Sequence, residues 1–403
     1  MVDEKFSRYR DLPSPDLWPE IERRLRSGDS SPHPSRHRLL GTVVALTTSA
    51  LVVAGVAAVL VVRSSHDRPQ VTEAASSPAT SSEPQSNAPT QTQTSSPSPA
   101  TTPPSPSGPG IIGTVELPGT YVAGITTGFG ALWALGSEGL SRIDPTTREI
   151  SWTKKISTGG PYEALTAGQG GVWLLAGEQV ARVEPTTGSV VARIRVGDSV
   201  GLLAAGSGGV WVGDFVRGTV SMVDPDTNTL GEPITIPCHT QAVCFPVSLA
   251  SGEGSLWVSS LEDTVYRIDP ATGDIAATIP GVGGHPGAAL AIGFGSVWAA
   301  GAGTVRIDPE TASVEAEWTD LDFAPGNAEI ETGEGYVWLL GIQGGLLFRV
   351  DPATNEQVGD PLNPFSRSVG SYLAVGEGAV WETGPPFAPV VVAEIDPRAG
   401  ISS

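Results

Sequence analysis

The residues of this chain best suited to chemistry are two histidines, His239 and His285, in its C-terminal, repetitive part. A histidine can serve as a general base or a metal ligand because its ring titrates near neutral pH. No H-E-x-x-H, phosphate-binding loop or nucleophile-elbow motif accompanies either of them. His285 stands in a Gly-Gly-His-Pro-Gly turn and is the better catalytic candidate, although a lone turn histidine also suits a structural role.

The two cysteines, Cys238 and Cys244, flank His239 in the longest insertion between repeats. Such a pair forms either a disulfide or part of a metal site. The four ligands that zinc needs are not present nearby, whereas an oxidising compartment favours a disulfide between closely spaced cysteines. The sequence therefore predicts a disulfide that pins this loop, no metal site, and an exposed His239.

Aromatic and charged residues are concentrated in loops, whereas the repeats are otherwise mostly Gly, Ala and Val. These loops link one repeat to the next, or the second strand of a repeat to the third. Loops on a rigid scaffold commonly carry binding sites, so we predict a ligand-binding face there. Its candidate residues are Tyr162, Glu163, Phe215, Arg217, His285, Arg367 and Tyr372.

The element that must position these loops is a repeat marked by tryptophan. A Gly-x-[VL]-Trp phrase recurs at intervals of 40, 38, 46, 41, 40 and 43 residues, at Trp133, Trp173, Trp211, Trp257, Trp298, Trp338 and Trp381. A period near 40 residues with strand-like content indicates one supersecondary unit, copied and stacked. Seven four-stranded units arranged radially make an all-β, seven-bladed β-propeller, which we predict for residues 111–397. We expect each Trp to fill space between adjacent blades.

An acidic residue followed by proline comes 10 to 15 residues after each Trp, at Asp144, Glu184, Asp224, Asp269, Asp308, Asp351 and Asp396. An Asp side chain can accept bonds from the backbone ahead of it and Pro presets φ, so each pair predicts a turn before the outer strand. Calcium binding is the alternative, since carboxylates ligate Ca²⁺. The best match begins at Asp224, but it has Thr229 in place of the required Gly and Thr235 in place of the closing Glu, which favours the turn.

The ends of the repeat array predict how the ring closes. The seventh repeat stops after Asp396-Pro397 without an outer strand, and an unassigned strand-like segment, residues 111–118, precedes the first Trp phrase. We predict that the strand 111–117 pairs with residues 390–395 of the last blade. Closure of this kind hides sheet edges that would otherwise aggregate.

Three segments precede the propeller. Residues 1–38 form an Arg-rich stub, and residues 39–62 are 24 residues without a charge. Such a run is long enough to cross a bilayer as a helix, and the arginine excess places the stub in the cytoplasm. The run is too long for an ordinary cleaved signal peptide, so we predict a signal anchor and a single-pass membrane protein with an extracytoplasmic propeller.

The composition of the linker and the net charge of the chain limit the kinds of partner that the protein can bind. Residues 63–110 are rich in Ser, Thr and Pro, which predicts a disordered spacer. From residue 69 onward there are 13 Lys/Arg against 35 Asp/Glu. Because such an acidic region repels nucleic acid and anionic lipid, we expect no nucleic-acid partner. We expect contact with the membrane only through the chain's own helix.

The repeats resemble a known group of bacterial propellers. Gly-x-[VL]-Trp followed by [IV]-Asp-Pro-x-[TN]-[GN] looks like the YVTN/YncE-like and virginiamycin B lyase-like superfamily over residues 111–397. The resemblance implies the propeller fold, but these folds host unrelated activities. Lyases of that group use Mg²⁺ and a His/Glu constellation to open a cyclic depsipeptide, and no motif here carries those roles onto His239 or His285.

We therefore predict a binding module rather than an enzyme: a membrane-anchored, extracytoplasmic propeller that recognises a cell-envelope component, a peptide or a protein, with no cofactor. The alternatives are a lyase-like or hydrolytic enzyme dependent on Mg²⁺ or Ca²⁺, and a sensor that signals through the cytoplasmic stub. The ligand, the oligomeric state and glycosylation of the linker are not encoded in any motif.

Overall fold

The computed structural model describes residues 108–156, 162–238, 245–282, 287–301, 303–318, 328–341, 345–365, 372–384 and 390–401. The predicted stub, membrane anchor and nearly all of the linker lie outside these residues. Within the described part of the chain, no helix has the length and apolar character needed to span a bilayer.

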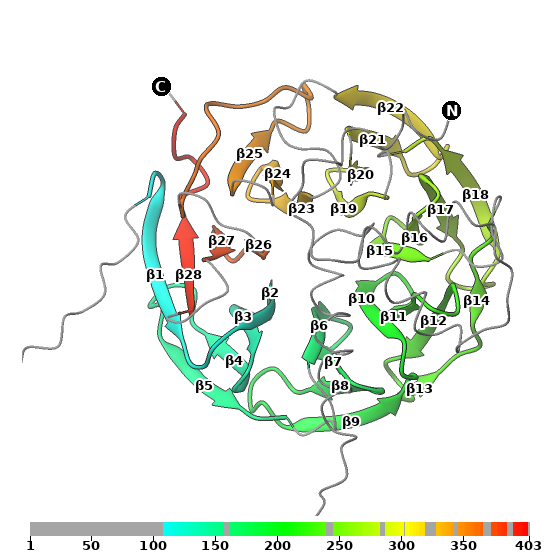
Figure 1. Ribbon diagram of the computed structural model, residues 1–403, viewed down its shortest axis with the longest axis horizontal. Helices are drawn as coiled ribbons and strands as arrows, with labels where there is room; N and C mark the ends of the chain where they lie inside the picture. The colour runs from blue at the N-terminus through cyan, green and yellow to red at the C-terminus, as the bar shows by residue number, and fades with distance from the viewer. Residues whose placement is uncertain are drawn as a thin grey trace, which may run out of the picture. The chain divides into compact units, whose positions relative to one another are not determined.

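The described residues form seven antiparallel sheets, the blades, arranged in a ring (Figure 1). Blade 1 contains β2 (Val122–Gly128), β3 (Ala131–Gly136), β4 (Gly139–Ile143) and β5 (Ile150–Lys154). Blade 2 contains β6 (Tyr162–Gly168), β7 (Gly171–Ala176), β8 (Gln179–Val183) and β9 (Val190–Arg195). Blade 3 contains β10 (Val200–Gly206), β11 (Gly209–Asp214), β12 (Thr219–Asp224), β13 (Thr229–Leu230) and β14 (Ile234–Thr235).

The remaining blades follow the same order from the inner to the outer strand. Blade 4 contains β15 (Pro246–Gly252), β16 (Ser255–Ser260), β17 (Thr264–Ile268) and β18 (Ile275–Pro280). Blade 5 contains β19 (Ala289–Gly293), β20 (Ser296–Ala300), β21 (Thr304–Asp308) and β22 (Ser313–Trp318). Blade 6 contains β23 (Ala328–Gly333), β24 (Tyr336–Gly341) and β25 (Leu346–Val350). Blade 7 contains β26 (Leu373–Gly376), β27 (Ala379–Thr383) and β28 (Val390–Ile395), with β1 (Ile111–Leu117) as its outer strand.

The innermost strand of each blade lies beside the innermost strand of the next, and β26 of blade 7 returns to β2 of blade 1. The blades approach closely at the end of these strands. A side chain at Gly206 of blade 3 would place its Cβ 2.0 Å from the carbonyl oxygen of Ser251 in blade 4, so only glycine fits there. The seven-bladed, all-β ring predicted from the repeat is confirmed.

The repeated tryptophans pack between blades, as predicted. All seven are at most 1% exposed. Trp133 of blade 1, for example, packs with Val172 and Leu174 of blade 2. In six of the seven, the indole N–H donates to a backbone carbonyl four or five residues earlier, as Trp133 does to Gly128 at 2.9 Å. Trp257 Nε1 is buried with no partner among the described residues, and nothing in the structure explains it.

The acidic-proline pairs form the predicted turns. In the first, Asp144 Oδ1 accepts the backbone N–H groups of Thr146 at 2.8 Å and Thr147 at 3.0 Å. The other acidic residues accept from the backbone in the same way, at Glu184, Asp224, Asp269, Asp308, Asp351 and Asp396. The carboxylates are therefore engaged in turn formation, which agrees with the turn and not with a calcium loop.

An arginine two residues before the turn links most blades to their neighbours. It lies over the tryptophan of its own blade in blades 1, 2, 4, 5 and 6. Arg306 of blade 5 stands 5.4 Å from the Trp298 ring and donates to the carbonyl oxygen of Pro352, in the turn of blade 6, at 2.9 Å. Such an arginine satisfies a turn carbonyl and a ring face at once.

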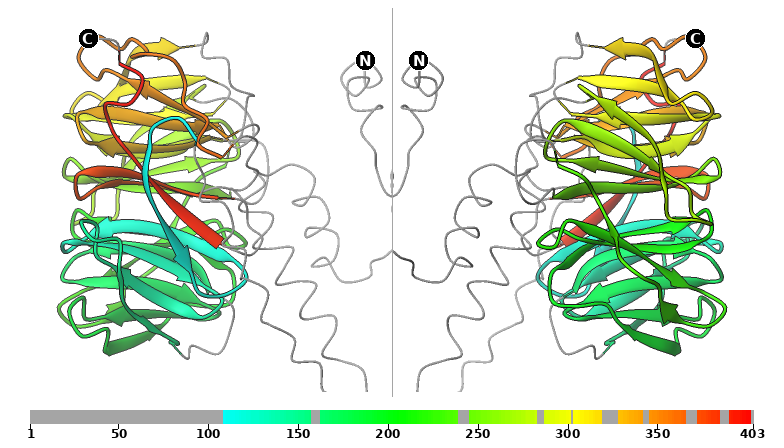
Figure 2. Two further views of the ribbon diagram at one scale, coloured as in Figure 1. Left: turned by 90° about the vertical axis from the view of Figure 1, so that its left-hand side faces the viewer. Right: turned by 90° about the vertical axis from the view of Figure 1, so that its right-hand side faces the viewer.

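Blade 7 closes the ring with the strand predicted for that purpose. β1 pairs antiparallel with β28, from Ile111 opposite Ile395 to Leu117 opposite Val390 (Figure 2, cyan beside red). Glu394 of β28 occupies the arginine position of this blade, and its carboxylate forms an ion pair with Arg148 in the turn of blade 1.

Two blades depart from the expected four regular strands at their outer edge. In blade 3 the outer strand is split into β13 and β14; Pro233 lies between them and has no N–H to donate. In blade 6 only isolated bridges, at Gln357 and Leu362, cover β25. Arg349 donates to the carbonyl oxygen of Val358 between those bridges, so a side chain takes up a bond that a regular strand would make.

Removing β1 is expected to destabilise the propeller strongly, because Val115 and Leu117 lose their burial and β28 becomes an open edge. Burial of two such side chains alone contributes about 3–6 kcal/mol. A chain lacking residues 1–117 should unfold at a much lower urea concentration than a chain lacking residues 1–107. Coincident unfolding curves for the two truncations would show that β1 does not hold the ring closed.

Candidate binding site

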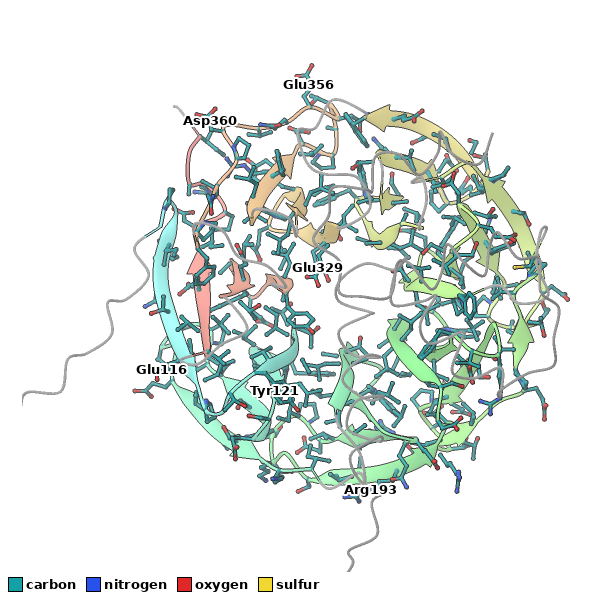
Figure 3. The ribbon with its side chains drawn as sticks, in the orientation of Figure 1. Glu116, Tyr121, Arg193, Glu329, Glu356 and Asp360 are labelled. Atoms are coloured by element: carbon teal, nitrogen blue, oxygen red, sulfur yellow. The ribbon has the colours of Figure 1, made fainter. Side chains whose placement is uncertain are left out.

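Two glutamates face each other across the boundary between blades 6 and 7. Glu329 lies in β23, and its Oε2 accepts the backbone N–H of Leu373, the first residue of β26, at 2.6 Å. In the sheet of blade 7, Leu373 pairs with Glu382 of β27. The Glu329 carboxylate is thus held against the backbone of the residue beside Glu382. Figure 3 shows the Glu329 side chain pointing from β23 toward the centre of the ring.

No other blade boundary carries charge at these two positions. Counted back from the glycine that ends the innermost strand, the Glu329 position holds Gly124, Ala164, Leu202, Ser248, Ala289 and Tyr372 in the other blades. The Glu382 position, directly after the repeated Trp, holds Ala134, Leu174, Val212, Val258, Ala299 and Leu339. The fold therefore does not require a carboxyl group at either place, and this glutamate pair is an addition to the scaffold.

The Glu382 carboxyl is buried without compensation. The residue is 0% exposed, and neither of its side-chain oxygens has a hydrogen-bond partner in the part of the chain that the structure describes. A buried carboxyl group without a partner costs several kcal/mol if it is ionised, so it takes up a proton instead.

Burial raises the pKa of both carboxyl groups. The pKa of Glu382 rises to about 8, first through desolvation and then through the negative charge of Glu329. The pKa of Glu329 also rises to about 8 by desolvation, opposed by the bond from the Leu373 N–H. Glu329 is only half-buried by surface area, so its desolvation comes mainly from the surrounding ring of blades. Near neutral pH the two groups therefore retain protons.

Two further groups adjoin the pair. Glu331 follows Glu329 on the same face of β23, and desolvation raises its pKa to about 7, but the residue is exposed and solvent opposes that rise. The phenol of Tyr372, just before β26, has its pKa raised by burial and by the charge of Glu329. The pair thus lies beside an aromatic hydroxyl that stays protonated, and together these groups offer oxygen acceptors to a cationic ligand.

Among the predicted site residues, the structure brings only Tyr372 to this cluster. His239, His285, Arg367 and Cys244 lie outside the described residues, and Tyr162 and Glu163 are described only as part of strand β6. Cys238 is disulfide-bonded. No group of three or more His, Cys, Asp or Glu suited to a metal ion occurs among the described residues.

Phe215 and Arg217 lie at the tip between β11 and β12, in a network that shapes the turn. Asp214 Oδ1 accepts the backbone N–H of Arg217 at 2.7 Å, and its Oδ2 accepts the Arg217 guanidinium at 2.6 Å. Ser199 Oγ also donates to Asp214, at 2.7 Å. Because its carboxylate partner is already supplied, Arg217 is engaged within the turn, although 59% of its side chain is exposed.

Neither Glu382 nor Glu329 was singled out from the sequence. The signal was present in the repeat alignment: Glu382 is the one charged residue directly after a repeated Trp. Glu329 and Tyr372 are likewise the two residues at their repeat position that carry an ionisable group. A position-by-position comparison of the seven copies would have found all three.

No protein-family model matches the chain, and no curated protein matches its sequence. Solved structures do share the fold. The WD40 domain of Neurospora crassa Pan2 is similar with a TM-score of 0.55 and 14% sequence identity, over 72% of this chain and 97% of that one. At this identity the likeness shows the β-propeller fold alone; membership of the YVTN-like or virginiamycin B lyase-like group stays a prediction.

The Glu382→Leu variant is expected to change how stability depends on pH. The folded chain holds protons on the pair up to a pKa near 8, while an unfolded glutamate releases its proton near 4.5. Folding therefore takes up protons between those values, and this contribution to stability is lost as the pH rises from about 5 to about 8. Leucine, which stands at this position in blades 2 and 6, has no proton to release, so the variant should not lose this stability as the pH rises.

Urea unfolding should show Glu382→Leu more stable than the native chain at pH 8, on the order of 2 kcal/mol, with the difference shrinking toward pH 5. The exposed Glu116→Leu on β1 serves as the control and should show no such trend. A difference between Glu382→Leu and the native chain that is independent of pH would contradict protonation of the pair.

Proposed function

We propose that this protein is a membrane-anchored, extracytoplasmic β-propeller that binds a peptide or another component of the cell envelope at the Glu329–Glu382 pair. The observation that carries the proposal is the pair itself. Burying two carboxyl groups lowers the stability of a fold, and six of the seven blade boundaries lack them. A rigid ring that keeps such a pair at the end where the inter-blade links attach is suited to ligand binding.

The placement outside the cytoplasm is supported by two features. Residues 39–62 have the length and apolar character of a membrane anchor, with arginines on their N-terminal side. Cys238 is disulfide-bonded, which is typical of oxidising compartments. The repeat phrases further support kinship with the YVTN-like and virginiamycin B lyase-like propellers.

Protease added to intact cells checks this topology. We expect the propeller to be shortened or lost from the outside while an N-terminal tag on residues 1–38 stays protected. Protection of the propeller until the membrane is permeabilised would place it in the cytoplasm and overturn the assignment.

Binding is tested by calorimetry with the full chain in detergent and soluble peptidoglycan fragments bearing free peptide amines. The double variant Glu329→Ala/Glu382→Leu, which restores residue types found in other blades, should weaken binding by about ten-fold or more. The control Glu334→Gln/Glu377→Gln alters turns at the other end of the innermost strands and should bind normally. Equal affinity in all three proteins would remove the pair from the binding site.

A lyase-like or hydrolytic enzyme is the second candidate, and one observation favours it. Carboxyl groups that keep protons near neutral pH can serve as general acids, and burial gives Glu329 and Glu382 this property. Consumption of the fragment during the same experiment, dependent on Mg²⁺ or Ca²⁺, would favour the enzyme over the binding module.

A further inference from the structure

We infer that the Glu329–Glu382 pair is a receptor for one organic cation, the primary ammonium or guanidinium group of a peptide ligand, and that binding it releases a proton from the pair. This inference rests on the proposed function and specifies the chemistry of its ligand.

The first step is geometric. The two glutamates reach the same blade boundary from opposite sides, since Glu329 bonds to the backbone of blade 7 and Glu382 sits on the strand paired with that backbone. Glu329 also lies close enough to Glu382 and to the Tyr372 phenol for its charge, when ionised, to raise the pKa of both groups. The three side chains therefore form one electrostatic unit rather than separate surface groups.

The second step is the missing countercharge. The strands around the pair, β2, β23, β24, β26, β27 and β28, contain no Lys, Arg or His. The nearest strand with a cation is β25, whose Arg349 lies over Trp338 and donates to the carbonyl oxygens of Pro397 and Ala399. The described part of the chain thus supplies acceptors for a cation and no cation of its own.

The third step is the kind of cation. A calcium or magnesium ion needs six or more oxygen ligands in defined geometry, and the pair with Tyr372 offers fewer. An ammonium or guanidinium group carries several N–H donors and is satisfied by two carboxylates, with an aromatic ring alongside. The unpartnered Glu382 carboxyl and the half-buried Glu329 carboxyl, with no side-chain cation on the described strands around them, fit a cationic nitrogen better than a metal ion.

Proton release follows from the charge state. A cation favours ionised carboxylates, so its arrival lowers their pKa and expels the protons that burial retains. The titratable or charged groups on the elements packed against the pair are Glu331, Tyr336, Arg349, Tyr372 and Glu394. Glu331 is exposed, and Tyr336 lies under the Arg349 guanidinium. Arg349 and Glu394 are already bonded elsewhere, the latter to Arg148. The proton is therefore assigned to the pair itself.

The test uses the full chain in detergent with N-acetyl-arginine amide and N-acetyl-lysine amide as probes. N-acetyl-citrulline amide, which has nearly the shape of the arginine probe without its charge, is the matched control. Calorimetry at pH 7 in phosphate and in Tris, two buffers with different ionisation enthalpies, counts the protons exchanged. We expect the citrulline probe to bind about ten-fold more weakly than the arginine probe, or more weakly still. Each cation that binds should release about one proton.

Two variants make the result specific. Glu382→Leu and, separately, Glu329→Gln should abolish proton release and weaken the cationic probes, with folding verified by thermal melting. Glu334→Gln, at the other end of β23, should bind like the native chain. Cationic probes that bind to Arg367→Gln but not to the native chain would mean that the chain's own arginine occupies the pair, and the inference would fail.

The remaining outcomes separate this inference from the proposed function. Envelope fragments that bind at the pair with no proton release, or as well as their uncharged analogues, would keep the binding module and overturn the cation receptor. Mg²⁺ or Ca²⁺ binding that Glu382→Leu abolishes would identify a metal site instead. Cationic probes that bind as expected while every envelope fragment fails would keep the receptor and overturn the proposed envelope ligand.

Discussion

The propeller depends on the packing of one blade against the next through a tryptophan. A blade alone leaves an apolar face uncovered, and the buried indole fills the space where two such faces meet. The arginine above the indole extends this contact, because it also donates to the turn of the following blade. Every blade is thereby held by the neighbours on both of its sides.

At the repeat positions of Glu329 and Glu382, the other six blade boundaries pack with uncharged residues. The boundary of blades 6 and 7 can therefore be compared with them directly. At the boundary of blades 6 and 7, Trp338 fills the space between the blades as elsewhere, and the strands Leu373–Gly376 and Ala379–Thr383 pair in the usual register. The charged residues that set this boundary apart are Glu329, Glu331 and Glu382. A repeated fold thus contains its own control: what one copy has and the others lack cannot be explained by the requirements of the blade.

The sequence was sufficient to predict the seven blades, the turn at each acidic-proline pair and the closing strand, because each of these recurs or completes a recurring unit. The split outer strand around Pro233 and the irregular edge of blade 6 near Arg349 were not predicted, since they depend on single residues that interrupt the pattern. The candidate site was predicted only in part. Tyr372 was predicted because it is an aromatic residue in a loop. Glu382 lies in a strand, and a charged strand residue is expected to face solvent unless the position of the neighbouring blade is known.

The ion pair between Glu394 and Arg148 joins the last blade of the ring to the first. The arginines of blades 2, 4, 5 and 6 donate to backbone carbonyls, which every turn possesses, so these contacts cannot distinguish one blade from another. At the place of Arg148 the other turns carry Gly188, Asn228, Gly273, Ala312, Asn355 and Gly400, none of which is charged. The acidic end of blade 7 is therefore matched in charge only by blade 1. The seven blades are otherwise similar, and this ion pair is specific to the first and the last of them. It therefore favours a closed ring of seven over a ring that closes one blade early.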